Sequence, residues 1–155
     1  MEDLEKFLLN VGVETEIIYT GVETYSVEAA AQALGTDVEA IVKSVVFEGR
    51  RGEVVIAIAG GGTRVDTRKL ATVTGINGLR LARPEVVLAR TGYPAGGTPP
   101  VGHRERLPVV MDTRVLRLPV VFGGGGSPEK LLRIAPADIV RLTGAVVADI
   151  SVAGP

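Results

Sequence analysis

The fold is decided by residues 42–59, which read VKSVVFEGRRGEVVIAIA. Two runs rich in Val, Ile and Ala, 42–47 and 53–59, flank the turn sequence Gly49-Arg50-Arg51-Gly52. Two such runs joined by a short turn that contains glycine are typical of a β-hairpin. Their near-continuous apolar character predicts two well-buried strands at the centre of a sheet.

On both sides of this hairpin, helical patterns alternate with strand patterns. Ser26, Asp37 and Asp66 are suited to begin helices as N-caps, and Gly35 and Gly144 are suited to end them. The predicted helices cover residues 4–11, 27–34, 38–41, 67–74, 84–90 and 136–142, and the remaining predicted strands cover residues 15–19, 107–111, 118–122 and 145–150. This alternation predicts a mixed α/β architecture, an α+β fold with helices flanking a central sheet.

Length, composition and charge exclude several classes of protein. The chain has 155 residues, and we expect residues 1–155 to form one domain. It has no cysteine, which excludes a disulfide framework, a thiolate zinc site and a cysteine nucleophile. A net charge of −1 excludes binding of nucleic acid by bulk electrostatics, so any such contact must be local. Without a signal-peptide pattern or a long apolar run, we expect a cytoplasmic protein with no membrane partner.

Lys43 is the first residue that could carry chemistry, because it interrupts an apolar strand. An ammonium group is tolerated there only if it is paired or faces a wet cavity. Lys43 on its own is consistent with an exposed charge at the start of a strand. Alternatively, it is a cation that lines a pocket, where it binds phosphate or polarises a carbonyl.

The stretch TGYPAGGTPPVGH, residues 91–103, is the second such feature. It holds four glycines, three prolines and the only histidine, His103. Glycines permit close backbone approaches and prolines fix φ. This composition therefore predicts a stiff loop of defined shape, of the kind that holds a bound group. A lone histidine at the end of a loop is more often a hydrogen-bonding strut than a catalytic base, and it has no histidine partner for a metal site.

Two glycine clusters, 60–62 and 123–126, each follow a strand. Their backbone N–H groups can form an anion-binding nest or let a ligand approach closely, and loop flexibility alone explains them equally well. Neither cluster has the spacing of a P-loop or of a dinucleotide-binding fingerprint. We therefore predict no nucleotide cofactor from them.

Together these segments resemble the YbaK/ProX family, the free-standing relatives of the editing insertion domain of bacterial prolyl-tRNA synthetases. Residues 41–47 resemble the family's lysine-bearing strand, and residues 91–103 resemble its GYxxGGxxPxG loop. Residues 107–112 resemble the strand after that loop, and Gly123-Gly124-Gly125 resembles the glycine turn before the closing helix. The resemblance covers nearly the whole chain and implies a single domain with a mixed, strongly curved central β-sheet flanked by helices.

The activity that this resemblance implies is deacylation of a mischarged aminoacyl-tRNA in trans, at the ester on the 3′-terminal adenosine. Such a site can use bound water, the ribose hydroxyl and an oxyanion hole, so it implies no metal and no cofactor. By the family's pattern, Lys43 contacts the terminal phosphate or ribose. The backbone of Gly96 and Gly97 holds the ester carbonyl or the adenosine.

Further substrate-binding positions follow from the same resemblance, at the pocket mouth, along the loop and in the opposite wall. They are Tyr19 at the mouth, Thr98, Pro99, Pro100, Gly102 and His103 along the loop, and Gly123, Gly124 and Gly125 in the wall. The implied substrate is tRNA for proline that carries a small amino acid such as alanine or cysteine. A prolyl-tRNA synthetase is a candidate partner. The sequence is compatible with either a monomer or a homodimer.

Two other functions compete with the editing hydrolase. The same pocket could belong to a binding module that holds a tRNA 3′ end or a nucleotide without hydrolysis. A purely structural α/β domain is the third interpretation, and it leaves the loop at 91–103 unexplained. Turnover of a mischarged tRNA, and its loss when Lys43 is replaced by Ala, distinguishes the enzyme from the binding module.

Overall fold

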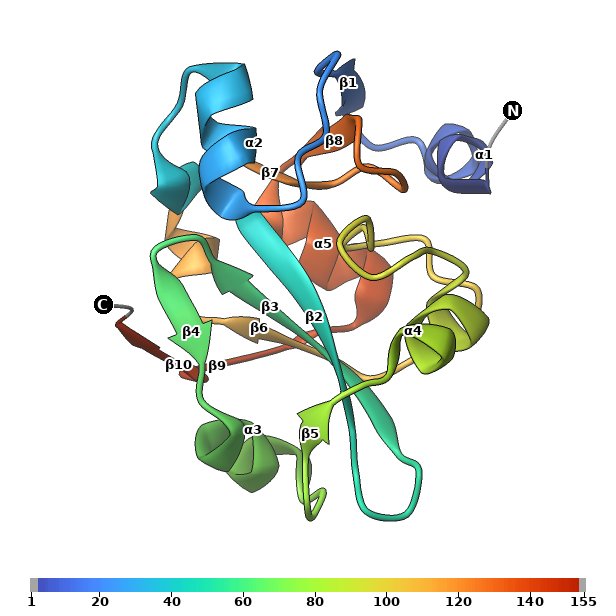
Figure 1. Ribbon diagram of the computed structural model, residues 1–155, viewed down its shortest axis with the longest axis vertical. Helices are drawn as coiled ribbons and strands as arrows, with labels where there is room; N and C mark the ends of the chain where they lie inside the picture. Colours follow the sequence, from blue (N-terminus) through green and yellow to red (C-terminus); the bar gives the residue numbers. More distant parts are fainter. Residues whose placement is uncertain (1–2, 154–155) are drawn as a thin grey trace.

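A five-stranded mixed sheet forms the centre of the protein, whose structure, a computed structural model, describes residues 3–153 (Figure 1). Its strand order is β5-β2-β3-β6-β9. The strands are β2 (Val42–Glu48), β3 (Val54–Gly60), β5 (Arg80–Leu81), β6 (Val109–Asp112) and β9 (Val146–Ala148). β2 and β3 pair antiparallel, with Lys43 opposite Ala59, which confirms the predicted central hairpin. β6 then adds parallel to β3, and β9 parallel to β6.

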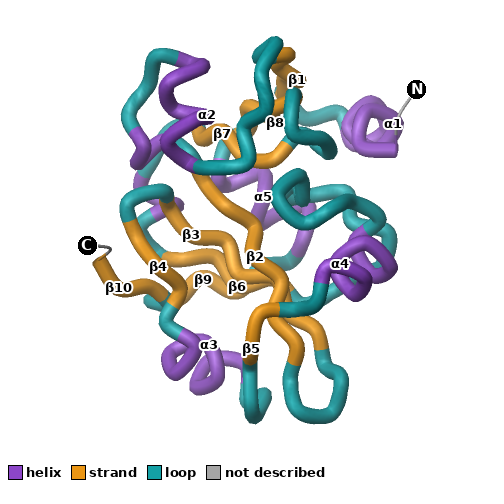
Figure 2. Tube along the Cα trace, viewed as in Figure 1, coloured by secondary structure: helices purple, strands orange, loops and turns teal. Residues whose placement is uncertain are grey.

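A second, antiparallel sheet of three strands lies next to the start of β2, and Figure 2 shows it above the central sheet. It has the order β1-β8-β7, and its strands are β1 (Thr15–Tyr19), β7 (Val121–Gly124) and β8 (Lys130–Ile134). An isolated bridge between Ile41 and Phe122 connects it to the start of β2. β4 (Thr63–Val65) and β10 (Ser151–Ala153) form a third, antiparallel pair.

Within residues 3–153, five α-helices surround the sheets: α1 (Asp3–Val11), α2 (Val27–Leu34), α3 (Thr67–Thr74), α4 (Pro84–Thr91) and α5 (Pro136–Thr143). Two predicted N-caps are confirmed, because Ser26 Oγ accepts the N–H of Ala29 at 3.0 Å and Asp66 Oδ1 accepts that of Arg68 at 2.9 Å. The helix predicted after Asp37 is a single 3₁₀ turn, η1 (Val38–Ala40). Within the described residues Asp37 makes no side-chain cap there, so the segment lacks both the bonds and the length of an α-helix.

Some predicted strand boundaries are wrong. The strand expected at 118–122 begins at Val121, because a 3₁₀ turn, η2 (Val115–Arg117), precedes it and the N–H of Leu118 still donates to Val115. β8 lies between the glycine turn and α5, where no strand was predicted. β4, β5 and β10 have only two or three residues each, too few to show an apolar pattern, and none of them was predicted.

The core lies on both faces of β3, which is buried along six of its seven residues as predicted. On one face, Ile56 and Ile58 belong to a buried apolar cluster that also contains Leu4 of α1, Val87 of α4 and Ile139 of α5. The other face packs residues such as Val55 and Ala57 against Leu70 of α3. Each fully buried aliphatic side chain of this size contributes about 1.5–3 kcal/mol. None of the helices in the described part of the chain has the length and apolar character to span a membrane.

Candidate active site

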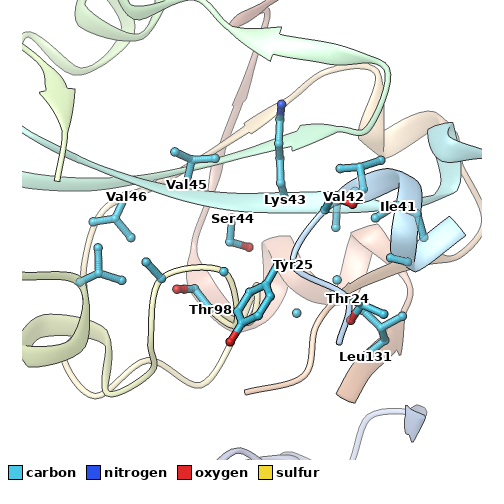
Figure 3. Close-up of a pocket in the computed structure, with 18 of the residues that line it drawn as sticks. Thr24, Tyr25, Ile41, Val42, Lys43, Ser44, Val45, Val46, Thr98 and Leu131 are labelled. Atoms are coloured by element: carbon cyan, nitrogen blue, oxygen red, sulfur yellow. The ribbon is translucent and has the colours of Figure 1, made fainter. Parts of the chain in front are cut away.

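A cleft of about 370 Å³ opens beside β2, between the start of α2, the loop 91–103 and β7 (Figure 3). Its walls are largely small or apolar. The residues that border it are Thr24–Val27, Ala30, Ile41–Val46, Leu81, Ala82, Val87, Ala95, Gly96, Thr98, Gly123, Gly124, Lys130 and Leu131.

The cleft lies at an unpaired stretch of the edge of β2. β5 pairs only with Phe47 and Glu48, and β7 touches the other end through the bridge at Ile41. The carbonyl of Val46 accepts the N–H of Ala82 at 2.9 Å, so it points away from β3. Because alternate residues of an antiparallel strand point their backbone groups the same way, the N–H and C=O of Ser44 also point away from β3, into the cleft.

The side chain of Ser44 faces the same space. Figure 3 shows it on the side of β2 that carries Tyr25 and Thr98. Its Oγ is buried and is the one such side-chain N or O atom in residues 3–153 without a hydrogen-bond partner. Sequence reasoning missed Ser44, although it interrupts the same apolar run as Lys43.

Lys43 points to the opposite side of β2 from Ser44, as strand alternation requires (Figure 3). It is half-buried, and its Nζ donates to the carbonyl of Thr63 at 2.7 Å. Burial lowers the pKa of Lys43 below its usual value, and the nearby carboxylate of Glu28 partly opposes this. Lys43 therefore borders the cleft, while Thr63 holds its ammonium group on the other side of β2 from the Ser44 hydroxyl.

The loop 91–103 presents Gly96 and Thr98 to the cleft. Gly96 has φ +88°, and a Cβ there would come within 2.8 Å of the ring of Tyr25, so glycine allows both the turn and the contact. Gly97 faces the β7–β8 turn instead: its carbonyl accepts the N–H of Gly126 at 3.0 Å, and its own N–H donates to Pro94. The loop is thus pinned to that turn next to the cleft.

His103 stabilises this loop through a hydrogen bond to its backbone. Its ring Nε2 lies 2.7 Å from the carbonyl of Pro99, which requires an N–H at Nε2 that donates to that oxygen. Burial lowers the pKa of His103, with the bond to Pro99 acting in the opposite direction, so the neutral ring is favoured. This geometry is that of a strut. Pro99, Pro100, Gly102 and His103 do not border the cleft.

The opposite wall contains Gly123 and Gly124, whereas Gly125 packs against the backbone of Lys130. Tyr19 lies outside the cleft with its side chain exposed, and the Nζ of Lys130 lies 5.0 Å from the centre of its ring. The structure therefore brings together Lys43, Gly96, Thr98, Gly123 and Gly124 of the predicted site. Tyr25 and Lys130, like Ser44, are cleft residues that the sequence did not indicate.

A family model of the aminoacyl-tRNA editing domain matches residues 22–142, a span that contains every residue bordering this cleft. The chain belongs to the aminoacyl-tRNA editing domain family. This confirms the resemblance drawn from residues 41–47 and 91–103, the mixed α/β fold, and, at the level of the family, a hydrolase that acts on aminoacyl-tRNA.

Relatives of this editing domain include free-standing proteins and parts of synthetases. EbsC of Enterococcus faecalis, named as a candidate Cys-tRNA(Pro)/Cys-tRNA(Cys) deacylase, is 27% identical over 126 residues, which cover 81% of this chain and 77% of EbsC. The proline–tRNA ligase of Pseudothermotoga lettingae is 36% identical over 110 residues, 71% of this chain and 19% of the ligase.

Solved structures of the same fold are also similar. A candidate trans-editing enzyme for prolyl-tRNA synthetase superposes with a TM-score of 0.88 at 36% identity, covering 98% of each chain. The hypothetical protein APE2540 superposes with a TM-score of 0.91 at 34% identity, covering 97% of this chain and all of the other. The editing domain thus matches free-standing proteins over almost its whole length.

Proposed function

We propose that this editing domain is a trans-acting deacylase that hydrolyses the ester of a mischarged tRNA, with tRNA for proline carrying a small amino acid as its substrate. The observation that carries the proposal is the cleft itself, which joins an open strand edge to a glycine wall in a volume of about 370 Å³. Such a volume suits a small aminoacyl group together with part of the terminal ribose. The names of the relatives support proline tRNA and, for one of them, cysteine as the amino acid that is removed.

In this mechanism the protein positions the ester and stabilises charge. Water attacks the ester carbonyl carbon, the bond to the ribose oxygen breaks, and that oxygen leaves with a proton as a free ribose hydroxyl. Backbone donors at the edge of β2 and near Gly96 would stabilise the oxyanion that forms on the carbonyl oxygen. The ester is already activated, so donors placed in advance can supply much of the catalysis without a side-chain nucleophile.

Lys43 has a different role in this proposal. Its Nζ donates to the carbonyl of Thr63, on the far side of β2 from the Ser44 hydroxyl. A cation there suits the terminal phosphate or ribose and not the ester carbonyl. Contact with phosphate would hold the tRNA end while the ester lies at the strand edge.

The test is release of amino acid from tRNA for proline charged separately with proline, alanine, cysteine and serine, in the presence of a chelator. We expect selective release of a non-proline residue, and a fall of at least tenfold in kcat/KM for Lys43→Ala. Lys43→Arg should retain part of the activity, because it keeps the charge. Lys6→Ala, which removes an exposed lysine of α1, serves as the matched control.

Failure to release any amino acid, combined with saturable binding of the tRNA 3′ end, would overturn the deacylase and favour a binding module. An unchanged rate for Lys43→Ala would instead overturn only the role given to this lysine. The same reactions with added prolyl-tRNA synthetase test whether a synthetase supplies tRNA recognition, which should then lower KM.

A further inference from the structure

We propose that the hydroxyl of Ser44 selects the amino acid, by hydrogen-bonding a hydroxyl or thiol on the side chain of the aminoacyl group. This inference rests on the proposed function and adds the chemical class of the residue that is removed. It favours serine or cysteine over alanine.

A buried hydroxyl without a partner is costly, because burial removes the hydrogen bonds that water would make. In the part of the chain that the structure describes, the other buried side-chain N and O atoms have partners, so Ser44 stands apart. Alanine at this position would avoid the cost without changing the strand. A hydroxyl retained in such a position is explained when a ligand group completes its hydrogen bonds.

The surroundings of Ser44 indicate what that group is. Neighbours along the strand, such as Val42 and Val46, border the same cleft but offer no polar side-chain atom. The hydroxyl of Thr98 already donates to the carbonyl of Pro94 at 3.2 Å. Ser44 is therefore a local polar point on a largely apolar wall, which suits a small side chain with one polar atom.

Other groups of the protein are available for the parts that every aminoacyl-tRNA shares, so the Ser44 hydroxyl is not needed for them. The α-amino group and the ester can be held by the N–H and C=O of Ser44, which point into the cleft at the open edge of β2. Phosphate and ribose suit the cation of Lys43 on the far side of the strand. The buried Oγ is then left for the variable part of the substrate, the side chain.

Hydrogen-bonding sites discriminate strongly, because an analogue that lacks the polar atom leaves the protein group unpaired. A net gain of one hydrogen bond corresponds to roughly a tenfold preference. We therefore expect wild-type protein to hydrolyse seryl- and cysteinyl-tRNA about tenfold faster, in kcat/KM, than alanyl-tRNA of the same tRNA.

The experiment compares wild type with Ser44→Ala on tRNA for proline charged with serine, cysteine or alanine. We expect kcat/KM to fall about tenfold for the first two and to change less than threefold for alanine. Thr72→Ala, which removes a hydroxyl from α3 outside the cleft, should leave all three values unchanged. An equal loss on all three substrates, or no loss on any, would overturn the inference.

Binding of non-hydrolysable analogues keeps this test independent of turnover. In 3′-seryl- and 3′-alanyl-amino-3′-deoxyadenosine an amide replaces the ester, and calorimetry gives the Kd of each. Wild type should prefer the seryl analogue, and Ser44→Ala should lose that preference; equal affinities in wild type would overturn the inference. If wild type releases no amino acid from any tRNA, the deacylase proposal fails while this pair of analogues still decides the role of Ser44.

Discussion

At the scale of single residues, the site depends on the alternation of neighbours along β2. Lys43 and Ser44 are adjacent, yet one carries its ammonium to Thr63 and the other its hydroxyl toward Tyr25 and Thr98. Two adjacent residues of one strand can therefore serve two sides of a bound substrate. A deletion or insertion of one residue between Ile41 and Lys43 would exchange the two faces and so abolish both contacts.

His103 provides a prediction about pH. Burial lowers the pKa of His103 in the folded protein, whereas the unfolded chain keeps a value near the usual ~6.5. As pH falls through about 6.5 the unfolded state takes up the proton first, so the free energy of unfolding falls. Denaturant titrations between pH 7.5 and 5.5 should show this loss in wild type and a smaller loss in His103→Gln. Identical slopes for the two proteins would exclude the histidine as its source.

At the scale of elements, the cleft depends on how the loop 91–103 meets β7. Gly124 packs so closely against the carbonyl of Thr98 that a Cβ at this position would overlap it. Gly123 packs against the ring of Pro100, where a Cβ would meet the ring carbon at 3.1 Å. Close approach therefore requires glycine at position 124, whereas at position 123 a Cβ would crowd the Pro100 ring and move it slightly.

Gly124→Ala should push the loop away from β7. We expect a loss of about 1–3 kcal/mol in the free energy of unfolding, the usual range for overpacking. We also expect a larger fall in kcat/KM than that stability change explains, because Gly96 and Thr98 move with the loop. Gly62→Ala is the control, since a Cβ there meets no atom within 4 Å. Equal stability of the two variants, measured by urea titration, would contradict the close contact.

Elements that depend on local sequence signals could be predicted, whereas those that depend on distant segments could not. The hairpin at 42–59 and the helices at Ser26 and Asp66 were predicted, because long apolar runs and caps are local signals. β8 was missed although it forms a hairpin with β7, because the glycine-rich turn obscures that local signal and its other partner, β1, lies more than a hundred positions earlier. Lys43 was recognised as a polar interruption, whereas the unpartnered state of Ser44 depends on atoms brought from other elements and cannot be read from the chain.

At the scale of the whole molecule, Asp112 ties the central sheet to the segment that leads into β10. This carboxylate is fully buried at the end of β6 and accepts the N–H of Ile150 at 3.0 Å. The guanidinium of Arg114 lies 3.3 Å from it and also donates to the hydroxyl of Ser151 at 2.7 Å. The Nζ of Lys69 in α3 forms an ion pair with the carboxylate of Asp149, 3.0 Å away, next to these residues.

Replacing Asp112 by Ala leaves the buried N–H of Ile150 without an acceptor. The expected loss in the free energy of unfolding is about 1–3 kcal/mol, the cost of an unpaired buried donor. Asp112→Asn keeps a carbonyl oxygen for Ile150 and should lose less. Asp149→Asn, at an exposed position, should lose least. Thermal and urea unfolding of the three variants measure these losses, and the reverse order would refute the network. The kcat/KM of each variant should be unaffected, because these residues lie outside the cleft.

The pairing of β1 with β8 sets the order in which the molecule can be completed during its synthesis. Thr15 lies opposite Ile134, so the sheet that carries one wall of the cleft cannot close until residues 130–134 have left the ribosome. The hairpin of β2 and β3 can form much earlier, because its contacts are local. A nascent chain that ends before β8 would thus display the open edge of β2 with no opposing wall, a state in which strand edges invite association with other chains.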